Sequence, residues 1–175
     1  MNFIKLNFTG VLQHYSPTKY VVIAPSSTYY RTERFPTKKS VIGLISASFG
    51  YDRNDERIKD LYNKLVCRYR TVRTGSVIID YQTVRSLNPN ERFKNFSGGN
   101  SDKNAIIKTV EYLQDYSFEV FIGCEDDTLF EIYKALVNPV YHQYFGKRSC
   151  VLSESIVSDF NLIKEEDITD VYDCT

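Results

Sequence analysis

Histidine and cysteine are scarce in this sequence of 175 residues, and tryptophan is absent. The four cysteines lie far apart and form no CxxC pair, and there are only two histidines, His14 and His142. Structural zinc sites and disulfide frameworks need suitably spaced thiols or imidazoles. We therefore expect no bound metal, no cofactor and no disulfide framework.

Long apolar runs and enzyme signatures are missing as well. No apolar run approaches the length of a membrane span, and no basic-then-apolar signal peptide opens the chain. We therefore expect a cytoplasmic protein with no membrane contact. The sequence has no HExxH, GxSxG or P-loop motif and no paired-carboxylate signal, so we expect no enzymatic activity.

The net charge is zero, but its distribution is uneven. Residues 1–122 contain 18 lysines and arginines against 11 aspartates and glutamates, whereas residues 123–175 contain 4 against 11. This asymmetry predicts a basic face and an acidic segment that lies elsewhere. The 14 tyrosines and 11 phenylalanines include rings that could stack on bases, although most aromatic side chains belong to a core.

A basic segment leads into an apolar helix at residues 31–50, and Gly50 is a natural helix end. Its four cations are Arg31, Arg34, Lys38 and Lys39. Cations in a first helical turn oppose the helix dipole, which favours anions there. The pattern predicts an external anion such as phosphate at the start of the helix. The alternative is a solvated loop before an ordinary core helix.

Hydrophobic periodicity predicts a mixed order of strands and helices. The expected strands are residues 2–9, 20–23, 66–74, 76–84 and 117–123. The expected helices are residues 38–50, 52–65 and 126–138. Thr74-Gly75 is a turn signal, so we expect 66–74 and 76–84 to pair as a ribbon. The polar stretch 86–105 predicts a loop or a protruding hairpin. This order suits an α+β fold of the ferredoxin-like (RRM) type.

Further cations occur on a predicted strand and in a predicted turn. Arg68 and Arg70 lie on one strand, where RNA contact and a solvated sheet face are equally open interpretations. Lys147 and Arg148 follow a glycine and could clamp a phosphate through backbone N–H groups and side chains together. A plain exposed turn is the competing interpretation. The last 25 residues contain seven acids and one lysine.

Four blocks of the sequence occur in an order that resembles a known family. The blocks are Pro36–Gly50 (PTKKSVIGLISASFG), Gly75–Val84 (GSVIIDYQTV), Tyr112–Ile122 (YLQDYSFEVFI) and Ala135–Cys150 (ALVNPVYHQYFGKRSC). Over residues 3–152 the sequence resembles the CRISPR-associated CasD family and is most similar to its type I-E branch. Members of that family hold the 5′ handle of the guide RNA in type I Cascade complexes.

The resemblance implies a fold, a function and a set of partners. The fold would be an RRM-like RNA-binding domain at residues 1–150, with a β-hairpin thumb inserted at about 86–110, and a short acidic C-terminal extension at 151–175. The chain would be a non-catalytic subunit of a hetero-oligomeric Cascade complex that caps the 5′ handle of the CRISPR RNA (crRNA). It would contact the backbone and large subunits, and target DNA only indirectly.

The resemblance and the charge pattern together select candidate site residues. The expected RNA-binding residues are Arg31, Arg34, Lys38, Lys39, Arg68, Arg70, Tyr81, Arg85, Lys147 and Arg148. The thumb residues expected to contact a neighbouring subunit are Arg92, Phe93, Lys94 and Phe96. Tyr69 and Tyr81 are the expected stacking platforms.

The sequence also departs from the family pattern. Val110-Glu111 stand where relatives often carry basic residues, which predicts weaker RNA binding at this point. Relatives usually also extend further at the C-terminus. Two other functions therefore remain open. One is a metal-independent endoribonuclease that processes pre-crRNA, with Tyr20, Lys39 and His14 as acid and base groups. The other is a shortened virus-borne homologue that joins Cascade and inhibits it.

Overall fold

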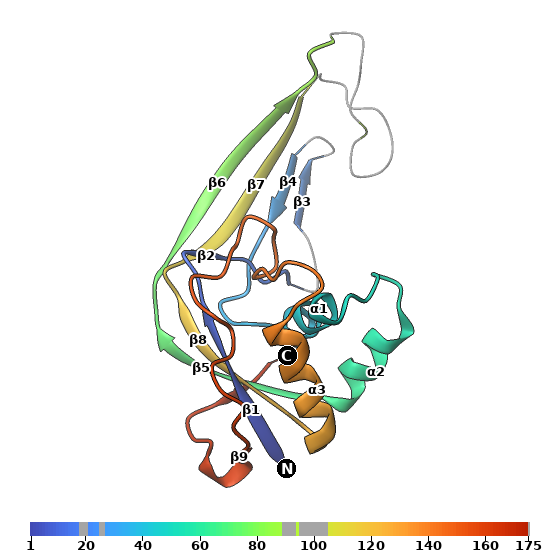
Figure 1. The fold of residues 1–175 in the computed structure, drawn as a ribbon. Helices are drawn as coiled ribbons and strands as arrows, with labels where there is room; N and C mark the ends of the chain where they lie inside the picture. Colours follow the sequence, from blue (N-terminus) through green and yellow to red (C-terminus); the bar gives the residue numbers. More distant parts are fainter. Residues whose placement is uncertain (18–20, 25–26, 89–93, 95–104, 175) are drawn as a thin grey trace.

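The computed structural model describes residues 1–17, 21–24, 27–88, 94 and 105–174. Within them the chain forms two β-sheets and three α-helices (Figure 1). The expected α+β class is confirmed.

The first sheet carries the core of the molecule. Its strands are β1 (Asn2–Thr9), β5 (Val66–Arg73), β8 (Ser117–Cys124), β9 (Ile163–Lys164) and β10 (Tyr172–Asp173), in the spatial order β10-β5-β8-β1-β9. Every neighbouring pair in this sheet is antiparallel. Because successive side chains of a strand point to opposite faces, Ile4, Leu6 and Phe8 lie on one face and Phe3 and Lys5 on the other.

Three helices cover one face of the first sheet (Figure 1). They are α1 (Lys38–Phe49), α2 (Glu56–Lys64) and α3 (Asp126–Val137). Ile4, Leu6 and Phe8 form one buried cluster with apolar residues of the helices, including Ile45 of α1 and Leu129 of α3. The helices therefore bury their apolar sides against this face, and the opposite face carries no α-helix among the described residues.

Both ends of α1 follow from local sequence. The Thr37 hydroxyl accepts a hydrogen bond from the Ser40 backbone N–H at the N-terminus. Gly50 adopts the left-handed conformation (φ 79°) at the C-terminus, which costs glycine little because it has no Cβ. The predicted helices over 38–50, 52–65 and 126–138 are confirmed, and the start of α1 at Lys38 is as predicted. The start of α2 differs from the prediction by a few residues.

The second sheet carries a long hairpin. Its strands are β2 (Leu12–Gln13), β3 (Val21–Ala24), β4 (Ser27–Tyr30), β6 (Ser76–Arg85) and β7 (Ala105–Gln114). β7 pairs antiparallel with β2 and β6 and parallel with β4. β6 and β7 project away from the first sheet as a long hairpin (Figure 1).

The predicted ribbon of strands 66–74 and 76–84 is wrong. β5 pairs with β8, and β6 pairs with β7 along its whole length. Thr74 and Gly75 therefore connect the two sheets instead of closing a hairpin. Gly75 fits there because a Cβ would lie 1.8 Å from the Gln114 carbonyl oxygen. The predicted thumb at 86–110 falls on the outer part of the β6–β7 hairpin, and its residues 89–93 and 95–104 lie outside the described residues.

The C-terminal segment adds a strand to each edge of the first sheet. β9 pairs with β1 at one edge, a short 3-10 helix follows at Glu165–Asp167, and β10 pairs with β5 at the opposite edge. The segment 163–173 therefore crosses the width of the sheet.

Candidate nucleic-acid interface

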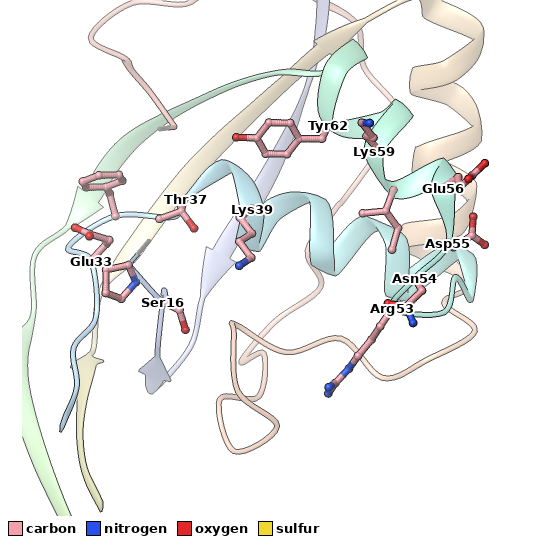
Figure 2. Close-up of a pocket in the computed structure, with 13 residues that line it drawn as sticks. Ser16, Glu33, Thr37, Lys39, Arg53, Asn54, Asp55, Glu56, Lys59 and Tyr62 are labelled. Carbon is pink, nitrogen blue, oxygen red and sulfur yellow. The ribbon is translucent and has the colours of Figure 1, made fainter. Parts of the chain in front are cut away.

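A cavity of about 820 Å³ opens at the start of α1, and we call it the α1 cavity. It is bounded by the first turn of α1, the loop before α2, one side of α2 and the chain segments around Ser16 and Glu33 (Figure 2). Figure 2 shows Lys39 pointing from α1 into the opening, with Ser16 on one side and Arg53 on the other. Pockets of this volume hold small ligands or single nucleotides.

Three cations and three acids line the α1 cavity. They are Lys39, Arg53, Lys59, Glu33, Asp55 and Glu56. Asp55 already has partners, because its carboxylate accepts from the Arg57 backbone N–H at 3.0 Å and from the Arg57 guanidinium at 2.5 Å. The hydrogen bonds from Arg57 lower the pKa of Asp55. No described carboxylate lies within ion-pair distance of Lys39, Arg53 or Lys59, so these three cations are available to an anion.

The N-terminus of α1 adds backbone donors beside these cations. Ser40 N–H is bonded to Thr37, but no described acceptor pairs with the N–H groups of Lys38 and Lys39. The first turn contains no acidic residue. The positive end of the helix dipole is therefore uncompensated, which favours an anion at this point.

The cavity also has aromatic and apolar walls, formed by Phe35, Ile58 and Tyr62. Phe35 stacks on Tyr69 with ring centroids 5.1 Å apart and an interplanar angle of 8°. The Tyr69 ring also meets Phe118 of β8, edge to face. Tyr69 is therefore occupied by the protein's own aromatic side chains and supports the cavity wall from behind.

Hydrogen bonds hold the segment 31–37 in place. The Glu33 N–H donates to the Tyr15 carbonyl at 2.8 Å, and the Tyr15 N–H donates to the Thr32 hydroxyl at 2.8 Å. Glu111 of β7 accepts from the Tyr29 hydroxyl at 2.5 Å and from the Thr32 N–H at 3.2 Å. The acidic residue at position 111 thus ties β7 to this segment, which is a structural reason for an acid at this position.

The structure separates the four leading cations. Lys39 alone lines the α1 cavity, whereas the Lys38 ammonium lies over the Tyr62 ring, 4.6 Å from its centroid. Arg31 is exposed and its guanidinium lies 5.6 Å from the centroid of the Tyr29 ring. Arg34 is also exposed, and its charge and that of Arg31 act on Tyr29 in the same direction. Arg31 and Arg34 thus form a separate basic area beside β4.

Lys147 and Arg148 lie in a tight turn that is flanked by two buried residues, Phe145 and Cys150. The Phe145 N–H donates to the Cys150 carbonyl and the Cys150 N–H to the Lys147 carbonyl, each at 2.8 Å. Phe145 and Cys150 are fully buried, and the turn between them is therefore fixed. Gly146 adopts φ 84°, and a Cβ there would lie 1.6 Å from the His14 carbonyl oxygen.

The turn faces the second sheet on the side opposite Arg31. The Lys147 ammonium lies 4.9 Å from the centroid of the Tyr30 ring, and Arg148 is exposed. Burial, and to a smaller extent the charge of Lys108, lower the pKa of Lys147. Because Tyr29 and Tyr30 are neighbours on one strand, they point to opposite faces of it. The structure thus places Lys147 on the face of β4 opposite Tyr29 and its neighbour Arg31.

Arg68 and Arg70 lie on the helix-free face of the first sheet. Arg68 pairs with Glu165 at 2.8 Å and with Asp173 at 3.5 Å. Arg70 forms an ion pair with Glu119, which also accepts from Lys5 at 3.0 Å. Both predicted RNA contacts are therefore engaged with acidic side chains in this structure, and they lie on the sheet face opposite the helices that border the α1 cavity.

The β6–β7 hairpin carries the remaining candidates. Tyr81 and Arg85 are exposed on β6, and Tyr81 pairs across the hairpin with Thr109. Lys94 is exposed. Arg92, Phe93 and Phe96, the other predicted subunit contacts, lie outside the described residues.

His14 is not arranged as a surface base. Its side chain is fully buried, Nδ1 lies 2.8 Å from the Glu111 carbonyl oxygen, and Nε2 lies 3.3 Å from the Ser16 hydroxyl. Burial lowers the pKa of His14. A group that takes a proton from a substrate must reach it, and both ring nitrogens of His14 are bonded inside the protein. Tyr20, the other expected partner of Lys39 in cleavage, lies outside the described residues.

Sequence reasoning missed two of the three cavity cations. Arg53 lies in the loop before α2 and Lys59 lies on α2, and the packing of α2 beside α1 brings them to Lys39. Their signal was weak, since charges on one side of an amphipathic helix usually indicate a solvated face. Lys108 of β7, whose charge acts on Lys147, was also missed, because a single cation on a strand gives no signal in the sequence.

The described residues contain no group of three or more His, Cys, Asp or Glu side chains that could hold a metal ion. None of the described helices is long and apolar enough to cross a membrane.

Comparisons with known proteins point to one family. The family model described as CRISPR-associated protein (Cas_Cas5) matches residues 4–173. The CRISPR system Cascade subunit CasD of Escherichia coli (strain K12) is 27% identical over 164 residues, which cover 89% of this chain and 69% of that protein.

Two solved structures share the fold. A chain of a "CRISPR RNA-guided surveillance complex" is similar with a TM-score of 0.72 at 24% identity, covering 90% of this chain and 62% of that chain. A "Crystal structure of Cas protein" gives a TM-score of 0.64 at 22% identity, covering 93% of this chain and 65% of that chain. This chain thus spans less than two thirds of the length of either solved chain.

Proposed function

Because the chain belongs to the Cas5 family of CRISPR-associated proteins, we propose that it is a non-catalytic Cascade subunit that binds and caps the 5′ handle of a crRNA. The observation that supports this most is the match of the family model to residues 4–173, together with the similarity to a Cascade subunit of the CasD type. The complex would be of type I, similar to type I-E.

We further propose that residues 1–150 form a ferredoxin-like, RRM-type domain with the β6–β7 hairpin as its thumb, and that the short acidic extension 151–175 packs on this domain and supplies its fourth strand, β9. The order of the first sheet supports this. β1, β5, β8 and β9 are the first, second, third and fourth strands of a β-α-β-β-α-β unit, and β8 lies between β1 and β5. The second sheet is then an addition between the second and third strands of that unit.

The α1 cavity is the proposed anchor of the handle. Lys39, Arg53 and Lys59 would pair with phosphates, and the N–H groups at the start of α1 would bind a phosphate oxygen. The rings of Phe35 and Tyr62 offer walls for an unstacked base. A single-stranded end fits such a site because its bases are free of a partner strand and its phosphates can turn inward.

The other basic residues would bind the RNA beyond the α1 cavity instead of forming one site with it. Arg31 and Arg34 lie beside β4, and Lys147 and Arg148 lie on the other face of the second sheet. Arg31 and Lys147 both lie close to β4, which pairs with β7. Arg85 lies further out, at the outer end of β6 and opposite Ala105. We propose that the handle passes β4 and continues along the hairpin.

The hairpin would reach the neighbouring subunits. The proposed contacts with the backbone subunit are Arg92, Phe93, Lys94 and Phe96, and Tyr81 offers an exposed ring on the way to them. The large subunit would be a further partner, and target DNA would meet the chain only through the complex.

Handle binding can be measured with a fluorescent handle RNA and complex that contains this chain. Lys59→Gln removes one cavity cation, so we expect roughly 5–10-fold weaker binding, or about 1–1.4 kcal/mol. The slope of log affinity against log salt should decrease by about 0.7 for each lost phosphate contact with a single strand. Lys39→Gln should behave in the same way.

Lys64→Gln is the matched control. Lys64 lies on the same helix, is exposed, and does not line the cavity. It should leave both the affinity and the salt slope unchanged. Equal effects of Lys59→Gln and Lys64→Gln would mean that the cavity is not the anchor. A metal-free incubation with a repeat-containing transcript should give no cleavage, and a product would support the ribonuclease alternative.

A further inference from the structure

The helix-free face of the first sheet combines aromatic rings with cations. Lys5 of β1, Phe121 of β8 and Arg68 of β5 lie opposite one another across three neighbouring strands, so their side chains share this face. Phe3 and Arg70 belong to the same face. The Arg68 guanidinium lies 5.4 Å from the Phe3 ring centroid, and that of Arg70 lies 5.7 Å from the Phe121 centroid.

This composition is that of a platform for single-stranded nucleic acid. Such platforms pair aromatic rings, on which bases stack, with cations that bind the phosphates between the bases. Here Phe3 and Phe121 are almost fully buried, at 0% and 4% exposure. Buried rings with arginines over them on an outer sheet face need a cover, since no α-helix lies on this side among the described residues.

The cover is acidic and belongs to the same chain. Residues 163–173, which we call the strap, cross this face from β9 at one edge to β10 at the other. The strap contains five acids and one lysine. Glu165 and Asp173 contact the Arg68 guanidinium, and the Thr169 carbonyl oxygen lies 3.5 Å from that of Arg70. The strap thus offers its anionic and carbonyl oxygens to the two arginines where an RNA would offer phosphates.

The attachments of the strap are short. β9 and β10 each pair over two residues, and the Cys174 N–H donates to the Cys67 carbonyl at 2.9 Å. Glu165 is 47% exposed and Asp173 is 76% exposed, and exposed ion pairs of this kind are individually weak. A polyanion that brings several phosphates to the same arginines at once can therefore compete with the strap.

We propose that the helix-free face of the first sheet is a second binding site for single-stranded nucleic acid, which the acidic strap occupies until such a strand displaces strap residues 165–173 and leaves β9 paired with β1. The α1 cavity lies on the helix side of the sheet, so this site is distinct from the proposed handle anchor and does not depend on it. Phosphates would replace the two strap carboxylates on Arg68 and the Thr169 carbonyl oxygen on Arg70, whose ion pair with Glu119 of β8 would remain. Bases would stack on the rings of Phe3 and Phe121.

Thiol labelling of the wild-type chain reports displacement directly. Cys174 is buried at the end of the strap, and Cys150 is buried in the body of the protein. We expect an oligouridylate to increase the alkylation rate of Cys174, read by mass spectrometry, several-fold while the rate at Cys150 stays constant. An unchanged Cys174 rate at a saturating oligonucleotide concentration would overturn the proposal, as would an equal increase at both cysteines.

Charge-neutral variants test the competition. Glu165→Gln with Asp173→Asn should tighten oligouridylate binding by roughly 3–10-fold, since surface ion pairs of this strength are lost. Asp127→Asn with Glu131→Gln on α3 makes the same change in net charge away from this face and is the matched control. Adding Arg68→Ala and Arg70→Ala to the strap variant should abolish the gain. Equal gains in the strap and control variants would contradict the proposal.

The two proposed sites can be tested independently of each other. Lys39→Gln and Lys59→Gln should weaken handle binding without changing the oligouridylate response at Cys174. If handle binding fails this test while Cys174 responds, the helix-free site stands and the handle anchor does not.

Discussion

Replacing Gly146 with alanine should destabilise the protein strongly. Gly146 has φ 84°, and an added Cβ would lie 1.6 Å from the carbonyl oxygen of His14. The left-handed conformation alone costs an L-residue about 1–2 kcal/mol. To relieve the clash, the turn must move away from His14, which breaks the 3.0 Å hydrogen bond from the His14 N–H to the Phe145 carbonyl. A buried group left without its partner costs about 1–3 kcal/mol more.

The expected loss is therefore about 2–5 kcal/mol, against a total stability of about 5–15 kcal/mol for a typical domain. For a chain of this size the Tm should fall by roughly 5–15 °C. Circular dichroism in urea and on heating is the suitable assay, since the chain has no tryptophan. Because Lys147 and Arg148 follow Gly146 directly, RNA binding by the folded fraction should also weaken.

Gly43→Ala is the matched control. Gly43 lies within α1, and apart from its chain neighbours and the nearby backbone of α1 no described atom lies within 4 Å of the position of an added Cβ. Alanine favours a helix over glycine by about 0.5–1 kcal/mol, so this variant should be slightly more stable than the wild type. If Gly146→Ala proved as stable as Gly43→Ala, the close contact of the turn with His14 would be wrong, and with it the fixed position of Lys147.

Three further predictions concern stability and reactivity. Burial lowers the pKa of His14 below its usual 6.5, so the unfolded state binds a proton first as the pH falls, and the free energy of unfolding should decrease below about pH 6.5. Urea titrations at several pH values check this, and His14→Gln should reduce the dependence of the unfolding free energy on pH. Glu111→Ala removes the acceptor of two hydrogen bonds and should cost about 1–3 kcal/mol in the same assay, whereas Lys108→Ala on the same strand should cost less than about 0.5 kcal/mol. Burial raises the pKa of Cys67 to about 12 and that of Cys124 to about 11, so the half-buried Cys124 should be alkylated before Cys67; the reverse order by mass spectrometry would contradict the described burial.

The helices were predictable because their signals are local. Thr37 and Gly50 mark the two ends of α1 through contacts within a few residues, and the apolar periodicity of α3 is visible in the sequence. Strand pairing is different in kind, because any extended segment can pair with several others. Thr74-Gly75 has the composition of a hairpin turn, yet β6 pairs along its whole length with β7, which lies beyond a long polar insertion.

The site was predictable only in part for a similar reason. Lys39 was found because it lies in the first turn of a recognisable helix. Arg53 and Lys59 reach the cavity through the packing of α2 beside α1, which the sequence does not display. Arg68 was correctly assigned to a strand, but its acidic partner Glu165 is 97 residues away in the sequence, so its pairing could not be foreseen.

The most direct test of the account is photocrosslinking of the assembled complex. A crRNA with 4-thiouridine in its 5′ handle should crosslink to peptides of this chain that contain Lys39 or Tyr62 at the α1 cavity. Lys39→Gln with Lys59→Gln should reduce these crosslinks. A handle that crosslinks only to other subunits, or to this chain only away from the α1 cavity, would contradict the central claim that the cavity anchors the end of the guide RNA.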